Sequence, residues 1–227
     1  MRLFYFLPFL ALWVTTPESM AQSLDSSKVY EAIEWHYQGR YSEALNRYNS
    51  LLLEFPESAL LHSEKSLTCA AMNDYPCCIA SGNRVLQNKK GEYHTEAYLS
   101  VSSCLDYSGE AQESIKLLKK ALRKKGENYL FYFNLGVTYF RMEEIDKSID
   151  YLQKGVMVNS AHPSGHLLLG LQERQKNNQV KAFMALQYFL LLEPSGPRAK
   201  QGAGALWALF QENAPIQTKK EDERKSN

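Results

Sequence analysis

A pattern of about 34 residues recurs along most of this 227-residue chain. Its clearest copy runs from Tyr129 to Ser160 and holds two segments in which apolar and small residues recur every three or four positions, as on one face of a helix. Successive copies start 34, 36, 34, 34 and 34 residues apart, near Asp25, Ala59, Thr95, Tyr129, Pro163 and, for a half-copy, Pro197. A period this regular predicts a linear array of stacked units, each contacting only its neighbours.

Each copy is predicted to form two helices joined by a short turn. The residues between the two segments include Gly39, Asn73, Gly109 and Asn177, and Gly and Asn suit the end of one helix followed by the start of another. No sustained segment alternates β-branched with polar residues. The sequence therefore predicts an all-α fold.

Two stretches carry a resemblance to a known repeat. In the clearest copy, aromatic residues stand three positions before and three positions after Leu135-Gly136. In the first copy, the run Gly39-Arg40-Tyr41-Ser42-Glu43-Ala44-Leu45 is followed by Tyr48 and closes with Pro56. This spacing resembles the tetratricopeptide (TPR) repeat. The resemblance implies a right-handed solenoid of about five helix-turn-helix units plus a C-terminal capping helix.

The repeat starts also predict the domain organisation. We expect a solenoid over residues 22–212, with units near 25–58, 59–94, 95–128, 129–162 and 163–196 and a cap helix at 197–212. A solenoid needs such a last helix to cover its final apolar face. Residues 213–227 are expected to form a disordered charged tail, because the sequence from Thr218 onward has no apolar residue.

Residues 1–21 have the pattern of a secretory signal peptide. Arg2 precedes an uncharged run from Leu3 to Val14, which is too short to cross a bilayer as a helix, since that takes roughly 20 residues. Ser19-Met20-Ala21 is a small-x-small pattern, so we expect cleavage after Ala21, with an uncleaved anchor as the alternative. Membrane contact is expected only through this segment, before cleavage.

The expected signal peptide predicts the compartment of the protein, and its net charge limits the class of partner. The short signal carries no retention sequence, so the periplasm is expected, with secretion or association with the cell envelope as alternatives. The chain has a formal net charge of +1, and its acidic and basic residues are interspersed. This pattern offers no basic patch of the kind that binds nucleic acid, so no nucleic-acid partner is expected.

Four cysteines fall in the second and third copies, at Cys69, Cys77, Cys78 and Cys104. In an exported protein such clustering predicts a local disulfide framework. A bond between adjacent Cys77 and Cys78 is strained, which leaves Cys69–Cys78 with Cys77–Cys104, or Cys69–Cys77 with Cys78–Cys104. We lean slightly to Cys69–Cys78, because Cys78 occupies the place that Ala44 has in the first copy. Alternatively, Cys69 and Cys78 are simply small buried residues.

No constellation of side chains predicts catalysis. The five histidines stand in different copies or at turns, without a nucleophile–base pair or paired carboxylates around them. His162 and His166 are four residues apart but bracket a proline and lack a further ligand in register, and no Cys-x-x-Cys pair exists. We therefore expect no enzyme, no metal or other cofactor, and no small-molecule substrate.

Function is then expected on the surface that stacking leaves open. In TPR proteins this surface is usually the concave groove lined by the first helix of each unit. The residues that the resemblance places in the groove are Val29, Ile33, Tyr37, Leu67, Leu99, Phe133, Val137, Phe140, Arg141, Leu167, Leu171 and Arg174, with Leu60 and Tyr107 beside them. Apolar residues stand where TPR co-chaperones carry the Lys and Asn of a carboxylate clamp, so that mode of binding is not expected.

An apolar groove flanked by Arg141 and Arg174 suits an amphipathic helix or an extended apolar segment of another protein. We therefore predict a non-catalytic adaptor or scaffold for protein–protein interaction in an exported compartment. The alternative is a self-assembling structural module of the cell envelope. It follows if Trp207 and Phe210, near the end of the array, mediate homodimers instead of only capping it.

Overall fold

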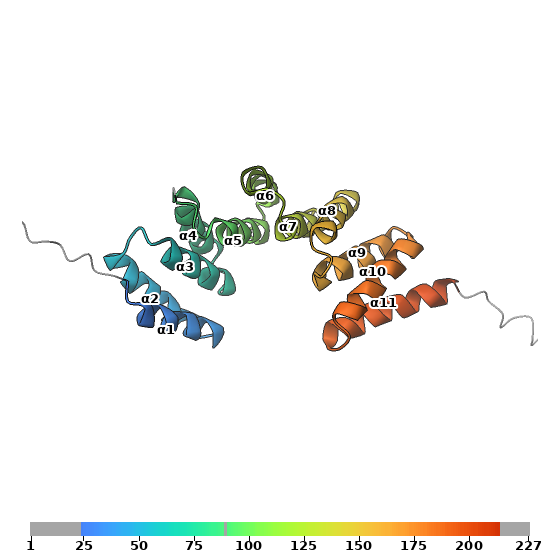
Figure 1. The fold of residues 1–227 in the computed structure, drawn as a ribbon, viewed down its shortest axis with the longest axis horizontal. Coiled ribbons are helices and arrows are strands. Elements are labelled where there is room, and N and C mark those ends of the chain that lie inside the picture. The colour runs from blue at the N-terminus through green and yellow to red at the C-terminus, as the bar shows by residue number, and fades with distance from the viewer. Residues whose placement is uncertain (1–23, 89, 214–227) are drawn as a thin grey trace, which may run out of the picture.

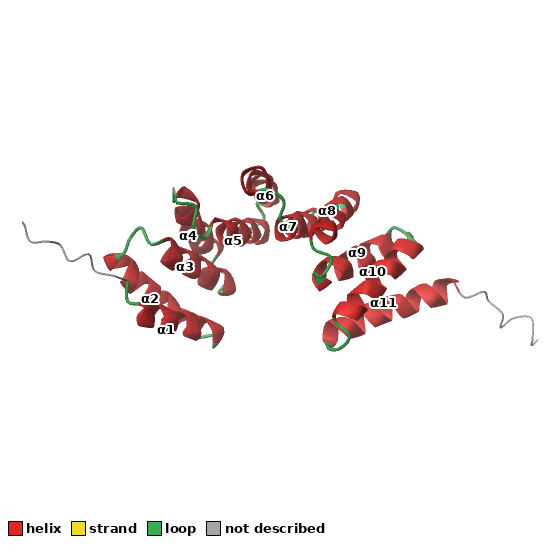
Figure 2. Ribbon diagram, in the orientation of Figure 1, coloured by secondary structure: helices red, strands yellow, loops and turns green. Residues whose placement is uncertain are grey.

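The computed structural model of the protein describes residues 24–88 and 90–213, which form eleven helices and no strand. Figure 2 shows that only short loops join the helices. The helices are α1 (Ser26–Tyr37), α2 (Tyr41–Glu54), α3 (Ala59–Ala71), α4 (Tyr75–Gln87), α5 (His94–Tyr107), α6 (Ala111–Lys125), α7 (Tyr129–Arg141), α8 (Ile145–Val158), α9 (Pro163–Gln175), α10 (Gln179–Leu192) and α11 (Pro197–Asn213).

The helices form an arch of stacked pairs (Figure 1). The odd-numbered helices lie toward the inner, concave side, the even-numbered helices lie toward the outer side, and α1 and α11 stand at opposite ends. No helix in the described part of the chain is both long and apolar enough to cross a membrane. The predicted all-α solenoid is confirmed. The expected signal peptide with its cleavage site, and the tail beyond Asn213, lie outside the described residues.

Local sequence explains where the helices begin and turn. The side chains of Asp25, Ser58 and Asn128 each accept a hydrogen bond from a backbone N–H in the first turn of the helix that follows. Every turn within a pair contains one residue with a positive φ, namely Gly39, Asn73, Gly109, Glu143 and Asn177. This left-handed conformation lets the chain leave one helix and enter the next within a few residues.

Small residues allow the two helices of a pair to cross closely. A Cβ atom on Gly136 of α7 would lie 2.7 Å from Cγ of Leu152 on α8, and a Cβ atom on Gly170 of α9 would lie equally close to Cγ of Leu186 on α10. Leu152 and Leu186 are buried in these crossings. The apolar core is therefore a chain of small clusters that runs from pair to pair along the arch.

Two disulfides join three consecutive helices. Cys69–Cys77 links α3 to α4, and Cys78–Cys104 links α4 to α5. Our slight preference for Cys69–Cys78 was therefore wrong, and the other pairing is present. Adjacent residues on a helix point about 100° apart, so Cys77 and Cys78 reach different neighbours, and the buried Cys78 faces the next unit.

Candidate functional site on the concave face

The concave face is formed by the first helix of each pair (Figure 1). It is rich in exposed aromatic and aliphatic side chains, and those of Tyr37, Leu67, Tyr107 and Phe140 are all open to solvent. Exposed aromatic groups are a feature of surfaces that bind other proteins. Two hollows in this face provide more specific geometry.

The larger of these two, here called the central hollow, lies between α5 and α7 and has a volume of about 300 Å³. Its floor reaches α6 through Ser114. It is lined by Ser102, Ser103, Asp106, Tyr107, Ser114, Phe133, Asn134, Val137 and Thr138. Apolar and hydrogen-bonding groups therefore line a single depression, as in sites that fix both the position and the orientation of a bound segment.

A carboxylate, a guanidinium and an aromatic ring meet at one edge of the central hollow. The Asp106 side chain is only 6% exposed, and its Oδ2 lies 3.5 Å from Nη1 of Arg141. The guanidinium carbon of Arg141 lies 3.8 Å from the centre of the Tyr107 ring, and that ring stacks in turn on Tyr75. Arg141 is thus held by two partners from the preceding unit and is not a freely moving surface cation.

Burial governs the protonation of Asp106. Removal of the carboxylate from water raises its pKa above the ordinary value, and Arg141 and the Thr138 hydroxyl offset only part of that rise. A carboxylate held in a partly dehydrated position costs stability, and such groups are concentrated at functional sites. Asp106 is therefore the strongest polar candidate in the concave face.

Ser114 adds an unsatisfied polar group to the same hollow. This residue is fully buried, and its hydroxyl has no hydrogen-bond partner among the described residues. An unpaired buried polar group is unfavourable by about 1–3 kcal/mol.

The N-terminal hollow is smaller, and most of the residues that line it are aliphatic or aromatic. It has a volume of about 200 Å³ and lies between the beginnings of α1, α3 and α5. Its lining consists of Leu24, Ser26, Val29, Tyr30, Ile33, Leu60 and Tyr93. It can accept an aliphatic or aromatic side chain, but it offers no charged group to orient one.

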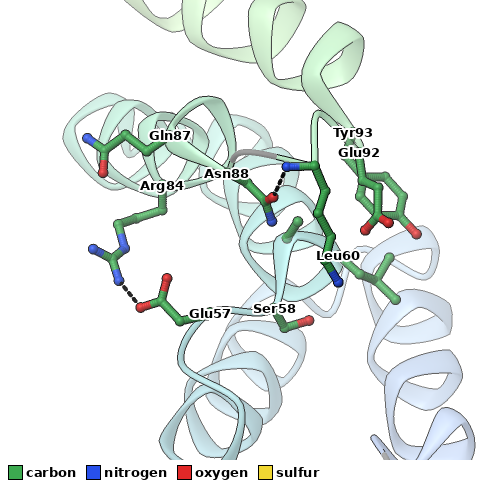
Figure 3. Close-up of a pocket in the computed structure, with 10 residues that line it drawn as sticks. Glu57, Ser58, Leu60, Arg84, Gln87, Asn88, Glu92 and Tyr93 are labelled. Atoms are coloured by element: carbon green, nitrogen blue, oxygen red, sulfur yellow. Dashed lines mark hydrogen bonds and ion pairs between the residues drawn. The ribbon is translucent and has the colours of Figure 1, made fainter.

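A hollow larger than these two, of about 630 Å³, adjoins the N-terminal hollow through the shared residues Leu60 and Tyr93 (Figure 3). Its wall contains charges of both signs, and Arg84 points toward Glu57, with Nη2 lying 2.7 Å from Oε1 (Figure 3). The backbone N–H of Lys90 donates to Oδ1 of Asn88. Because its wall carries no buried polar atom without a partner among the described residues, this hollow is a weaker candidate than the central one.

The structure separates the expected groove residues into three groups. Phe133, Val137 and Arg141 come together at the central hollow, and Ile33 lines the N-terminal hollow. Tyr37, Leu67 and Phe140 are exposed elsewhere on the first helices. The remaining residues contribute to packing or to an ion pair. Val29, which also lines the N-terminal hollow, and Leu167 are buried core residues. Leu99 and Leu171 pack against core clusters, and Arg174 pairs with Glu212 of α11 at 2.6 Å.

Sequence reasoning missed the polar part of the site. It did not name Asp106, Ser114 or Asn134, because it considered only apolar and basic residues on the first helices. One signal was present: Asp106 and Arg141 carry opposite charges and stand about one repeat period apart. Residues separated by one period lie side by side on neighbouring units, so such a pair predicts a contact across the unit boundary.

Within the described ranges, no group of three or more His, Cys, Asp or Glu side chains is arranged to hold a metal ion. His162 lies at the start of α9, where its ring meets that of Phe133 edge-on at 4.8 Å. His166 contacts Tyr188. The two histidines are thus engaged in separate aromatic contacts.

Comparison with known proteins shows the fold. A family model described as a tetratricopeptide repeat matches residues 129–162. The chain is similar to PilW, a widely conserved type IV pilus biogenesis factor, with 15% identity, a TM-score of 0.67, and coverage of 87% of this chain and 96% of that one. It is similar to the thermophilic TPR protein TTC0263 of Thermus thermophilus, with 16% identity, a TM-score of 0.65, and coverage of 80% and 98%.

A third similar structure is YrrB, described as a TPR protein with an unusual peptide-binding site. It has 13% identity and a TM-score of 0.55, with coverage of 81% of this chain and 99% of that one. A search of curated protein sequences found no match. The fold is a TPR solenoid, as the spacing around Leu135-Gly136 predicted.

Proposed function

We propose that this protein is a non-catalytic adaptor that binds a segment of another protein along its concave face. The observation that carries the proposal is the central hollow, where the buried Asp106 carboxylate and the unpaired Ser114 hydroxyl lie beside Phe133 and Val137. Such a site costs stability without a ligand and fits a chain that brings both hydrogen-bond donors and apolar side chains. YrrB, which is described as having a peptide-binding site, supports a polypeptide as the ligand class.

The two hollows define the chemistry of the bound segment. The N-terminal hollow accepts an apolar side chain, and the central hollow accepts a group that donates to Asp106 beside an apolar contact. An amphipathic segment that lies across several first helices satisfies both hollows. To the apolar groove flanked by Arg141 and Arg174 that the sequence predicts, this proposal adds a polar centre at Asp106 and Ser114.

We place this function in an exported, oxidising compartment, with the periplasm first. The paired cysteines support that placement, because disulfides persist in oxidising compartments and are rare in the cytosol. The sequence pattern of residues 1–21 points the same way. The likeness to PilW, a type IV pilus biogenesis factor, suggests assembly of a surface structure as one setting for the adaptor.

Site-specific cross-linking in cells tests the proposal. A photoreactive residue is placed at Tyr107 or Phe140 on the concave face, and at the exposed Leu53 of the outer helix α2 as the matched control. The expected result is an adduct with one protein from the two concave positions and none from Leu53. Phe140→Ser should then weaken binding of that purified protein at least about tenfold. Equal adducts from Leu53, or unchanged affinity, would contradict the proposal.

Asp106→Asn is expected to raise the melting temperature at pH 7 while weakening the binding of the partner. Burial holds the pKa of Asp106 above its unfolded value, so its contribution to stability is present at low pH and lost as pH rises through the folded pKa. Asparagine does not ionise and escapes that loss. The advantage of the variant should therefore shrink as the pH is lowered below the ordinary Asp pKa.

The control for this change is Asp150→Asn, at an exposed position on α8. Thermal unfolding followed by circular dichroism over the acidic and neutral range gives the measurement. If Asp106→Asn melts below the unaltered protein at pH 7, then the ion pair with Arg141 outweighs the dehydration of the carboxylate, and this account of Asp106 is wrong.

A further inference from the structure

The outer side of the arch has a hollow of its own between the outer helices α4 and α6 (Figure 1). It has a volume of about 330 Å³, and we call it the outer hollow. Both helices pack on α5, whose buried residues Val101 and Leu105 form the floor between them. Leu117 of α6 adds to this apolar floor, and Lys116 and Lys120 stand on the same wall. The outer hollow is therefore an apolar recess with lysines beside it.

The next boundary along the arch shows how the same space is filled elsewhere. Tyr139 and Tyr151 stand one repeat period after Leu105 and Leu117. Their rings stack on each other, with centroids 5.4 Å apart and planes 7° apart, and Nζ of Lys119 donates to the Tyr139 hydroxyl at 3.2 Å. Leucine side chains at the equivalent positions are shorter and leave the recess open. Specific residues at one boundary thus produce the outer hollow, and not the repeat as such.

Basic side chains gather on α6, which forms one wall of the outer hollow. The chain as a whole has a net charge of only +1, but α6 carries six basic residues and one acidic residue, and α4 has no acidic residue. The acidic residue, Glu113, pairs with Lys116 at 2.6 Å. Lys120, Arg123 and Lys124 have no ion-pair partner among the described residues. The walls of the hollow therefore carry positive charge that no described carboxylate neutralises.

We propose that the outer hollow binds an acidic segment of a partner protein, which inserts one aliphatic side chain into it. The aliphatic side chain contacts Leu105 and Leu117 at the floor, and Asp or Glu residues on either side of it pair with Lys116 and Lys120. Complementary charge raises the rate and the specificity of association. An apolar side chain that fills a pocket supplies a large part of the affinity. The recess and the charge beside it thus select the same kind of partner.

The geometry favours a polypeptide over a membrane or a nucleic acid. Helices that bind membranes place protruding apolar side chains below the charged headgroups. Here the apolar groups are recessed: Val101 is 1% and Leu105 is 9% exposed, and α6 has no exposed large apolar side chain. A nucleic acid brings phosphates but no aliphatic group, and the lining of the outer hollow contains no aromatic ring on which a base could stack. A peptide can bring carboxylates and an aliphatic group together.

The outer hollow is separate from the central hollow of the concave face. The central hollow lies between α5 and α7, the outer hollow lies between α4 and α6, and no residue lines both. The inference therefore goes beyond the proposed binding at the concave face and does not depend on it. A segment bound at one hollow leaves the other open, so one copy of the chain can link two partner proteins.

Selection from a display library of random short peptides tests the proposal. Peptides are kept if they bind the unaltered protein and Phe140→Ser but not Leu117→Tyr, which fills the outer hollow with the side chain that the next boundary has at this repeat position. We expect these peptides to carry Asp or Glu on both sides of an aliphatic residue. Lys116→Glu/Lys120→Glu should weaken their binding at least about tenfold, and high salt should weaken binding to the unaltered protein.

The matched control is Lys154→Glu/Lys200→Glu, which makes the same change of charge at exposed positions away from the outer hollow and should leave the affinity unchanged. Unaltered melting temperatures separate loss of the site from loss of the fold.

The proposal is overturned if no peptide depends on Leu117, if the peptides that do so lack acidic residues, or if the two double variants weaken binding equally. Binding to vesicles of phosphatidylethanolamine and phosphatidylglycerol that Lys116→Glu/Lys120→Glu abolishes, without any peptide that depends on Leu117, would assign α6 to membranes and would also overturn it. None of these outcomes bears on the concave face, which Phe140→Ser tests.

Discussion

Gly136→Leu is expected to lower the free energy of unfolding by about 3 kcal/mol. Even the Cβ atom of the new side chain would lie 2.7 Å from Cγ and 2.8 Å from Cδ2 of Leu152. Leu152 is buried between α7 and α8, so α8 must shift as a whole to make room. That shift would disturb the packing of α8 against α9 and extend the damage to the next unit. Urea unfolding followed by circular dichroism measures the loss.

The same exchange at Gly204 is the matched control. Gly204 occupies the equivalent repeat position on α11, but a Cβ atom added there would have no described atom within 4 Å. In dilute solution, Gly204→Leu should preserve stability or raise it by up to about 1 kcal/mol, because glycine is a poor helix former. Equal unfolding midpoints for Gly136→Leu and the unaltered protein would show that the crossing is not closely packed.

Removing the Cys78–Cys104 disulfide with the double variant Cys78→Ala/Cys104→Ala is expected to lower the free energy of unfolding by about 3.5 kcal/mol. The bond closes a sequence separation of 26 residues, and this restriction of the unfolded chain supplies most of the expected effect in the chain-entropy account of disulfides. It also ties the second unit to the third, at a boundary that otherwise depends on side-chain packing. Chemical unfolding without reductant is the measurement.

The matched comparison is Cys69→Ala/Cys77→Ala. That bond closes a separation of only 8 residues within one helix pair, so its removal should cost less, about 2.5 kcal/mol. A strong reductant should lower the free energy of unfolding of the unaltered protein to that of a variant that lacks all four cysteines. Identical unfolding curves with and without reductant would show that the cysteines are not bonded in the purified protein.

The sequence predicted the helix pairs because their signals are local. Apolar spacing, the turn residues Gly39 and Gly109, and the prolines that open α9 and α11 all act within a few positions of the helix they delimit. The repeat period then fixes how one pair stacks on the next. For this reason the all-α solenoid followed from residue order without knowledge of any contact.

The polar centre of the candidate site could not be predicted in the same way. Whether Asp106 is buried depends on how α5 and α7 rotate against each other, and Arg141 comes to it from the next unit. The same rotation decides that Val29 and Leu167 pack in the core whereas Leu67 and Phe140 face solvent. Helical spacing gives the face of a residue on its own helix, but not the depth to which a neighbouring helix covers it.

The preferred pairing, Cys69–Cys78, was wrong for a related reason. Equating Cys78 with Ala44 identified a buried position correctly, but not the helix that the sulfur faces. In the structure α4 is bonded to a neighbour on each side, through consecutive residues. That direction is set by the angle between adjacent side chains on α4.

The two bonds around α4 have a consequence for proteolysis. Every peptide bond between Cys69 and Cys104, except the one joining Cys77 to Cys78, lies inside a covalent ring closed by sulfur. A protease that nicks the chain there, for example in the connection before α5, releases no fragment. Both halves stay attached until a reductant separates them, so in an oxidising environment damage to this part of the arch leaves the molecule in one piece.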